Sequence, residues 1–324
     1  MIMKSFRFHF ATPLILAAVL LCAPALAQRL PDSVFDQKSQ AFGNTLQDAP
    51  PDILSVELSP EAPAANDPVW VRAIIKVNPD MSYFRVNRAV LNYSTDGAQY
   101  TELPMELVDD ARGLWQAQIP GQPAGTTVQF TLAGWDEIGN AVFQIPVQQS
   151  VSRDALFPAI NDQRDKDIPD GLDILEMQYG TDGKNFYYCQ ILAGPFQSFT
   201  MLGASANAMA INNNDLRFNT QLSHNENDGP YIAFAPQFEI ATIVDIQAVL
   251  KGKKIDDAPG VSVSAKGNRV CARAPVSSII KDPKRGVKVF SATVALNPAS
   301  EELVLVDCSP YAILYTGGVS YTVK

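Results

Sequence analysis

The stretch DKDIPDGLDILE, residues 165–176, places five carboxylates within twelve residues. Carboxylate oxygens are the hard ligands that calcium prefers, and clustering them without a cation costs mutual repulsion. The helix-flanked calcium loop does not fit, because Pro169 occupies the fifth position, where a ligand belongs, and Gly171 comes one place late. The residues that follow read as strand, turn and strand. A helix-loop-helix calcium sensor is therefore rejected.

An irregular calcium site at the edge of a β-sandwich remains open, because calcium accepts six to eight oxygens from loops. Its predicted ligands are Asp165, Asp167, Asp170 and Asp173. We expect such an ion to be structural, tying a linker to the module that follows it. The alternative is a solvated linker in which Arg164 and Lys166 offset part of the repulsion.

A second group of polar residues lies between Asn212 and Pro230. Side chains rich in hydrogen-bonding groups suit sugar hydroxyls or a hard cation, and they also suit plain turns. The residues predicted to bind a ligand combine this segment with two tyrosines: Asn213, Asp215, Asn225, Asp228, Tyr179 and Tyr187. Alternate members of the tyrosine-rich run point into the core of any sheet.

Enzyme chemistry lacks its usual residues. The chain has two histidines; His9 lies in the N-terminal leader, so only His224 remains, and no GxSxG nucleophile motif accompanies it. One histidine and scattered cysteines exclude a zinc site of several histidines or a CxxC arrangement. We predict a protein that is not an enzyme. A polysaccharide hydrolase that uses carboxylates of residues 212–230 is kept as an alternative.

The first 27 residues read as an export signal. Lys4 and Arg7 precede the apolar run of residues 14–22, and Ala25 and Ala27 form a small-residue cleavage site. The apolar run is too short to span a bilayer, which needs about 20 residues. We expect cleavage after Ala27, no transmembrane anchor, and a secreted or periplasmic location.

Charge limits the partners. Removing Lys4 and Arg7 from the 25 basic residues leaves 23 against 34 acidic ones, so the mature net charge is −11. An acidic surface without a basic stripe repels the phosphate backbone. Nucleic acid is therefore excluded as a partner.

A first module follows a linker over residues 28–50. Strand-like segments, bounded by turn residues, recur about every ten residues, which is typical of a β-sandwich. These segments are ILSVEL, VWVRAIIKV, VNRAVLNYS, YTELPMEL, LWQAQI, TVQFTLAGW and AVFQIPV. The motifs NYSTDG and QIPGQPAGTTVQFTLAGWDEIGN make residues 51–148 resemble immunoglobulin-like or fibronectin type III-like modules of secreted bacterial proteins. That resemblance implies a fold and no activity.

The three tryptophans all lie in this module. Trp70, Trp115 and Trp135 sit in alternating strand patterns. Exposed, they would serve as stacking platforms for sugars; buried, they would fill the core of the sandwich. We favour the core.

Residues 149–172 are polar and without period, and we predict a second linker. Residues 173–324 again show strand segments, including ILEMQY, NFYYCQIL and VKVFSATVAL. The stretches DILEMQYGTDGKNFYYCQI, ANAMAINNND, ARAPVSS and VDCSP resemble DOMON and family-9 carbohydrate-binding modules. The resemblance implies a β-sandwich that binds carbohydrate or haem. Haem would use His224 with a methionine (Met177, Met201 or Met209), but both residue types have ordinary explanations as loop surface and core.

Three cysteines survive export: Cys189, Cys271 and Cys308. In an oxidising compartment one pair can form a bridge, and the sequence leaves all three pairings open. We prefer Cys271 with Cys308, and expect Cys189 to be a buried inert thiol. The alternative is that all three are small core residues.

Together these patterns predict an all-β protein with two β-sandwich domains in tandem after a cleaved signal peptide. We expect an exported, non-catalytic binding protein whose ligand is carbohydrate or a cell-surface polymer. A structural or adhesion protein that assembles with protein partners is the alternative from another class, and a haem-binding module or a hydrolase are further ones. Calcium is the expected ion, and haem is not expected.

Overall fold

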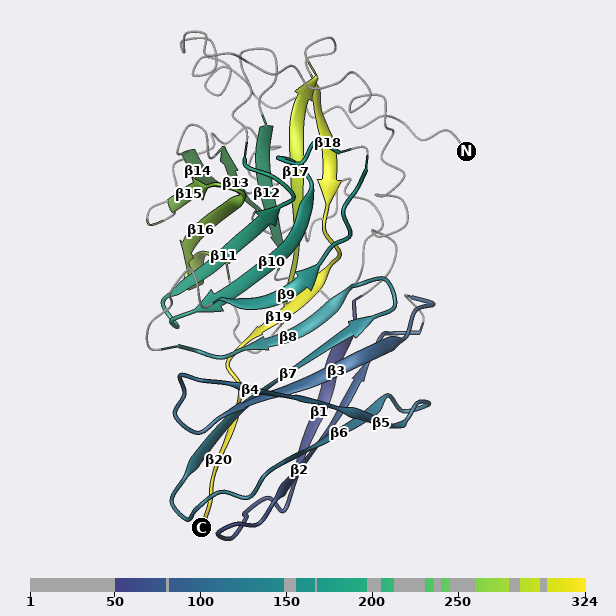
Figure 1. Ribbon diagram of the computed structural model, residues 1–324, viewed down its shortest axis with the longest axis vertical. Helices are drawn as coiled ribbons and strands as arrows, with labels where there is room; N and C mark the ends of the chain where they lie inside the picture. Colours follow the sequence, from purple (N-terminus) through teal and green to yellow (C-terminus); the bar gives the residue numbers. More distant parts are fainter. Residues whose placement is uncertain are drawn as a thin grey trace.

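The computed structural model describes residues 50–79, 82–148, 156–166, 168–196, 205–212, 231–235, 240–244, 260, 262–279, 286–297 and 302–324 (Figure 1). These residues form three β-sheets and one helix of four residues, α5 (Val276–Ile279). The sheets have a sandwich-like arrangement, which confirms the predicted all-β class. In this part of the chain, no helix is long and apolar enough to cross a membrane.

A four-stranded sheet, here called sheet A, forms one layer of the first sandwich. Its order is β1 (Asp52–Ser59), β2 (Val69–Lys76), β6 (Leu114–Ile119) and β5 (Glu106–Asp109). Strand β2, with the sequence VWVRAIIK, alternates between buried and more exposed residues. This period of two is that of a sheet with one face on the core.

A sheet of eleven strands, here called the long sheet, runs through both halves of the molecule. Its path is β14 (Ile240–Val244), β13 (Tyr231–Ala235), β12 (Ser205–Asn212), β17 (Val287–Asn297), β19 (Ala312–Thr316), β8 (Ala141–Ile145), β7 (Thr127–Asp136), β3 (Val86–Ser94) and β4 (Thr101–Pro104). Two further strands pair beside this path: β18 (Glu302–Cys308) with β17, and β20 (Val319–Thr322) with β7.

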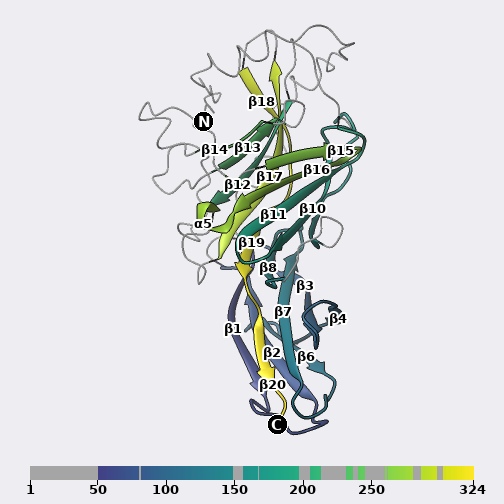
Figure 2. The same cartoon turned by 90° about the vertical axis from the view of Figure 1, so that its left-hand side faces the viewer.

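A third sheet, sheet C, belongs to the second half. Its order is β15 (Ser262–Lys266), β16 (Arg269–Pro275), β11 (Asn185–Leu192), β10 (Ile174–Thr181) and β9 (Phe157–Asn161). The hairpin of β10 and β11 turns at Asp182 and Gly183, as the sequence predicts. In both views of the ribbon, the first sandwich and the second half lie end to end (Figures 1 and 2).

The long sheet is buried on both faces where the two halves meet. Leu132 of β7 and Val142 of β8 pack into a core with sheet A. Their neighbours Ala133 and Phe143 pack into a second core with residues of sheet C. Successive residues of a strand point to opposite faces, so the same strands serve both cores.

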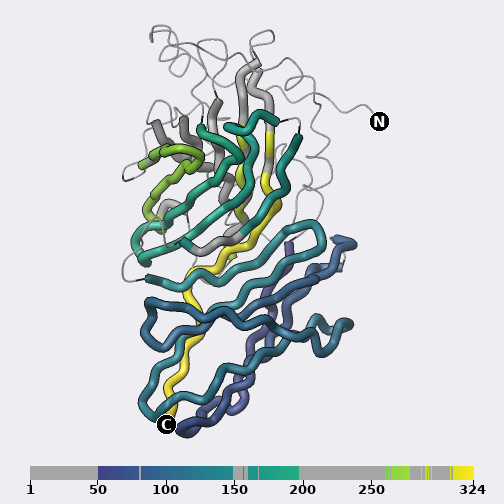
Figure 3. The backbone as a smooth tube through the Cα atoms, viewed as in Figure 1, coloured from purple at the N-terminus to yellow at the C-terminus, as the bar shows by residue number. Residues whose placement is uncertain are grey.

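The chain also returns to the first sandwich near its C-terminus. Strand β19 pairs in parallel with β8, and β20 then pairs with β7 (Figure 3). Tyr321 and Val323 are buried in the core of the first sandwich. The division into domains at residues 51–148 and 173–324 stays a prediction, and the strand pairing adds a contact that the sequence did not indicate.

Two segments differ from the sequence expectation. The segment YTELPMEL forms two strands, β4 in the long sheet and β5 in sheet A, and buried Met105 lies between them with its amide donating to the Ala89 carbonyl at 3.0 Å. The segment 149–172, predicted as a linker, contains β9, which pairs with β10. In each case the strand pairs with the strand next to it in sequence, β4 with β3, β5 with β6 and β9 with β10.

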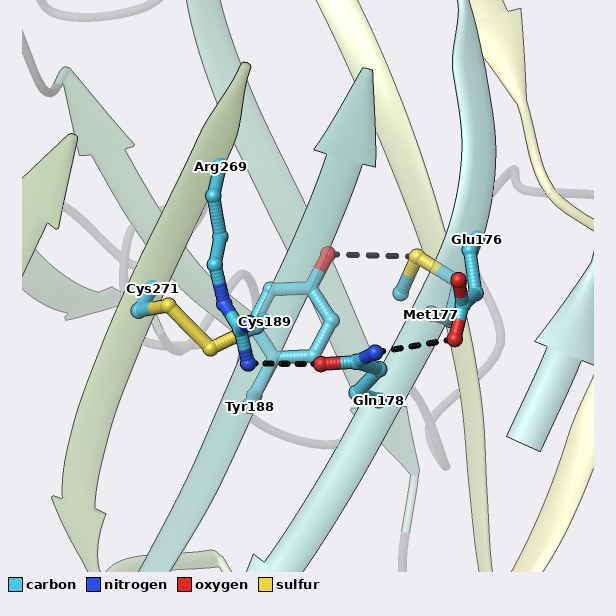
Figure 4. Close-up of a disulfide and its surroundings, with 7 residues drawn as sticks. All are labelled: Glu176, Met177, Gln178, Tyr188, Cys189, Arg269 and Cys271. Carbon is cyan, nitrogen blue, oxygen red and sulfur yellow. Dashed lines mark hydrogen bonds between the residues drawn. A yellow bond between two sulfur atoms is a disulfide. The ribbon is translucent and has the colours of Figure 1, made fainter. Parts of the chain in front are cut away.

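The preferred cysteine pairing was wrong. Cys189 of β11 lies directly opposite Cys271 of β16, and the two form a disulfide with their Cα atoms 4.1 Å apart (Figure 4). Cys308 lies on β18, opposite Ala292 in the long sheet. The bridge follows from strand register over 82 residues, which cysteine spacing does not reveal.

Candidate functional site

The predicted calcium ligands separate into exposed and buried residues. Asp165 is exposed, Asp167 lies outside the described residues, and Asp170 accepts a hydrogen bond from Arg164 at 2.6 Å on the surface. Asp173 is fully buried. Burial, together with the charges of Asp165 and Asp170, raises the pKa of Asp173, and a calcium site at these residues stays a prediction.

Asp173 is only partly satisfied. Its Oδ1 accepts a hydrogen bond from the Asp165 amide at 3.3 Å. Its Oδ2 is buried and has no hydrogen-bond partner among the described residues. Burial raises the pKa of Asp173 to about 6, because an apolar environment disfavours the charged form.

Two further carboxylates, which sequence reasoning missed, flank the start of β10. The Asp307 Oδ2 accepts a hydrogen bond from the Ile174 amide at 2.6 Å, and the Asp162 amide donates to the Leu175 carbonyl at 2.8 Å. Burial, together with the charges of Asp307, Asp165 and Asp173, raises the pKa of Asp162 to about 8. The sequence does carry one signal for these two residues: Asp162 directly follows β9, and Asp307 lies next to the last residue of β18.

We call Asp162, Asp173 and Asp307 the acidic cluster. In the described part of the chain, no three His, Cys, Asp or Glu side chains stand close enough together to hold a metal ion in their present positions. The cluster therefore combines burial, negative charge and one acceptor without a donor.

A separate pocket lies between the two halves. Its cavity of about 60 Å³ has room for several water molecules but not for a sugar ring. Strands β3, β4, β7 and β8 of the first sandwich line it together with β10 of the second half. The polar and aromatic residues of the lining are Asn92, Glu102, Thr131, Gln144, Trp135, Phe143 and Tyr179.

Tyr179 is the predicted ligand residue that reaches this pocket. Its ring is fully buried and packs near Tyr188 and Phe186, with ring centroids 5.6 and 5.9 Å away. Its hydroxyl is buried without a hydrogen-bond partner among the described residues. Tyr179 is therefore no open platform for a sugar ring, but it offers one unused hydroxyl group.

Tyr187 has a different role. Its hydroxyl donates to Asp182 Oδ2 at 2.9 Å, while the amides of Lys184 and Asn185 donate to Asp182 Oδ1. These contacts fix the Thr181-Asp182-Gly183 turn. The other predicted ligand residues, Asn213, Asp215, Asn225 and Asp228, lie outside the described residues.

Trp135, one of the residues that line the pocket, contacts two further side chains. The Arg88 guanidinium lies 4.5 Å from the centroid of the Trp135 ring, and Phe143 meets the same ring edge-on at 5.3 Å. Arg88 also donates to Glu102 Oε1 at 3.3 Å. Glu102 and Trp135 thus line the pocket, and Arg88 contacts both of them.

The other two tryptophans lie in sheet A and differ in exposure. Trp115 is buried and its Nε1 donates to the Ile75 carbonyl at 3.2 Å, which is the core role expected. Trp70 is 37% exposed, opposite Ser59 and Gln118 on the outer face of sheet A. The expectation of core packing therefore does not hold for Trp70.

The haem alternative finds no support at Met177. Its side chain is buried, and its sulfur accepts a hydrogen bond from the Tyr188 hydroxyl at 3.5 Å (Figure 4). Met201 and His224 lie outside the described residues, as does the side chain of Met209. No haem ligand pair can be assembled from the described side chains.

No protein-family model matches this chain, and no curated protein is significantly similar to it. Among solved structures, it is similar to the adhesin InvE of Yersinia pseudotuberculosis, at 12% sequence identity and a TM-score of 0.18, over 80% of this chain and 58% of that one. It is also similar to the collagen adhesin of S. aureus, at 9% identity and a TM-score of 0.15, over 85% of this chain and 96% of that one. This chain thus spans less than two thirds of the first neighbour, and TM-scores this low support no inference about function.

Proposed function

We propose that this chain is an exported, non-catalytic binding protein that recognises the end of a carbohydrate or cell-surface polymer at the pocket between its two halves. The observation that carries the proposal is the buried Tyr179 hydroxyl, which lines the pocket and has no partner among the described residues. A buried polar group without a partner costs free energy, and a ligand hydroxyl would remove that cost.

The size of the pocket decides how such a ligand binds. A cavity of about 60 Å³ admits a hydroxymethyl group or the edge of a ring, and the remainder of the ligand would lie at the mouth. Glu102, which lines the pocket, offers an acceptor for sugar hydroxyls, and Arg88, which contacts Glu102 and Trp135, offers donors. Planar polar groups beside aromatic rings are the usual means by which proteins hold sugars.

Export is supported by the leader sequence and by the Cys189–Cys271 disulfide. Disulfides persist mainly in oxidising compartments such as the periplasm and the extracellular space. A location outside the cytoplasm places the pocket where envelope polymers and extracellular glycans occur.

The test is a glycan-binding screen of the purified protein, followed by calorimetry on any ligand found. Tyr179→Phe removes the hydroxyl and keeps the ring, so we expect affinity to fall about tenfold, which corresponds to one lost hydrogen bond. Tyr187→Phe is the matched control, because its hydroxyl serves the Asp182 turn. Equal affinities of the Tyr179→Phe variant and the wild type would contradict the proposed site, and release of product from a polysaccharide would contradict a non-catalytic role.

Adhesion to a protein partner is a second candidate, favoured by sheet A. Large apolar side chains are exposed on three of its strands: Leu54, Trp70, Leu107 and Val108. Strands β1 and β5 are also its two edges, and edge strands can pair with another chain. Replacing Leu107 and Val108 with Lys would abolish binding of such a partner and leave glycan binding unchanged.

A further inference from the structure

Strand β20 completes one side of β7 in the first sandwich. Strand β7 pairs along its other side with β3, from Gln129 to Asp136. The side that β20 completes is divided, because β8 pairs with Ala133–Trp135 and β20 pairs with Thr127–Phe130 (Figure 2). Without β20, residues 127–130 would form an open edge, and such edges accept another strand. We call this edge, with the core behind it, the strand site.

Strand β20 also supplies side chains to the first core. Tyr321 and Val323 are 8% and 3% exposed, and Val319 packs against the same core. Ser320 and Thr322, which alternate with them, are exposed. This period of two is that of a strand with one face on a core. The strand site therefore fits a segment with an apolar side chain at every second position.

The link between β19 and β20 consists of two glycines. Strand β19 pairs with β17 and β8, whereas β20 pairs with β7, so Gly317 and Gly318 join strands that have different partners. Gly317 has a φ of +94°, and its amide donates to the Ile145 carbonyl at 2.8 Å. Glycine has the least restricted backbone of all residues. A rotation at this link moves β20 away from β7 and leaves the pairing of β19 unchanged.

One contact of β20 is incomplete. The Tyr321 hydroxyl is buried and has no hydrogen-bond partner among the described residues. A buried polar group without a partner costs free energy, which it regains when it reaches water. The docked strand is therefore less stable than the burial of its apolar side chains alone would make it, and this difference favours its release.

We propose that two copies of this chain exchange β20, so that β20 of each copy pairs with β7 of the other and the two form a dimer. The strand site matches this segment closely. Thr127 and Thr322 lie directly opposite each other, with their Oγ1 atoms 3.3 Å apart. The Lys324 amide donates to the Pro63 carbonyl at 2.9 Å. A second copy offers the identical strand, so the dimer keeps these contacts, and its share rises with protein concentration. The exchange does not depend on ligand binding at the pocket.

Cysteine substitutions on β7 and β20 test the exchange in the full-length protein. Thr127→Cys and Thr322→Cys are made as separate variants, mixed at high concentration, warmed to just below the melting temperature, cooled and oxidised. We expect a disulfide-linked dimer in which mass spectrometry finds a cross-linked peptide joining positions 127 and 322. The variant with both substitutions in one chain is expected to form the same bond within the chain.

Two results would overturn the proposal. If the double variant forms its bond and the mixture gives no such peptide, β20 is not exchanged. If the double variant fails to form its bond, the pairing of β20 with β7 on which the exchange depends is wrong. Bridges through Cys308 do not confuse the result, because they give other cross-linked peptides.

Two controls separate exchange from collision between molecules. Arg72 and Gln116 lie opposite each other on β2 and β6, and both strands are paired on both sides. A mixture of Arg72→Cys and Gln116→Cys is expected to give no cross-linked dimer, and a yield equal to that of the first mixture would contradict exchange. The oxidised double variant, with β20 tied to β7, is expected to stay monomeric in size-exclusion chromatography with light scattering where the wild type forms a dimer. Equal dimer formation by both would assign the dimer to another surface and contradict the proposal.

Discussion

Asp136 in the first sandwich and Asp173 in the second half are both buried carboxylates, at 2% and 0% exposure. Asp136 accepts hydrogen bonds from the amides of Ile138 and Asn140 and from the Asn140 side chain, at 2.8–3.0 Å. Asp173 accepts one at 3.3 Å and leaves its other oxygen without a partner among the described residues. The two aspartates are thus equally buried, but Asp136 is held by the hydrogen bonds of a turn, whereas one oxygen of Asp173 has no hydrogen bond from the described residues.

The difference separates structural carboxylates from candidate ligands. Hydrogen bonds to the charged form stabilise it, whereas burial and neighbouring negative charges destabilise it. Asp136 closes the turn that begins β8 and needs no further group. Asp173 has a single such donor among the described residues, the Asp165 amide, so its environment favours a proton or a cation. The number of hydrogen-bond donors around a buried carboxylate, rather than its burial, therefore indicates whether that carboxylate is a candidate ligand.

The largest expected effect on stability is at Asn140, whose side chain donates a hydrogen bond to the satisfied carboxylate, Asp136. Its side chain donates to Asp136 Oδ2 at 3.0 Å and accepts from the Tyr311 amide at 2.9 Å, so it joins the turn to the segment before β19. Asn140→Ala removes both of these buried hydrogen bonds, one of them to a carboxylate, and should lower the free energy of unfolding by about 3 kcal/mol. Urea denaturation measures this, and a loss below about 1 kcal/mol would show that water replaces both contacts.

The same substitution at the two aspartates tests the comparison directly. Asp136→Asn places an amide donor opposite the Asn140 side chain, which is itself a donor. We expect the free energy of unfolding to fall by about 2 kcal/mol. Asp173→Asn, in metal-free protein, removes an unpaired buried charge and should change stability by less than about 1 kcal/mol or increase it. Both variants are measured by urea denaturation at neutral pH. Equal losses would mean that Asp173 has donors outside the described residues.

The sequence predicts what local patterns determine. The strand-like segments VNRAVLNYS and LWQAQI coincide with β3 and β6, and the Asp-Gly pair at 182–183 gives the expected hairpin. Both depend on residues close along the chain. The Asp-x-x-Gly-Asn turn was also recognisable, and there Gly139 adopts a φ of +92°, the left-handed region that glycine favours.

The sequence does not predict contacts that depend on how strands far apart in the chain are paired. The parallel pairing of β8 with β19 and the bridge between Cys189 and Cys271 join segments that have no local signal for each other. The acidic cluster is of the same kind, since Asp307 meets Ile174 across 133 residues. The carboxylates of residues 165–170 attracted attention because they are adjacent in sequence, while the buried ones are adjacent only in the fold.

The smallest expected effect concerns Asp182, a carboxylate near the surface that is satisfied like Asp136. Although partial burial raises its pKa, hydrogen bonds from the Asn185 side chain, the amides of Asn185 and Lys184 and the Tyr187 hydroxyl lower it to about 2. A folded pKa below the unfolded value of 3.8 means that the stabilisation is complete above about pH 4 and is lost as pH falls toward 2. With screening by solvent, we expect about 1 kcal/mol. Urea denaturation of wild type and Asp182→Asn from pH 5 to pH 2 should show the difference in stability shrinking, and a constant difference would mean that the donors around Asp182, unlike those around Asp136, contribute nothing to its charged form.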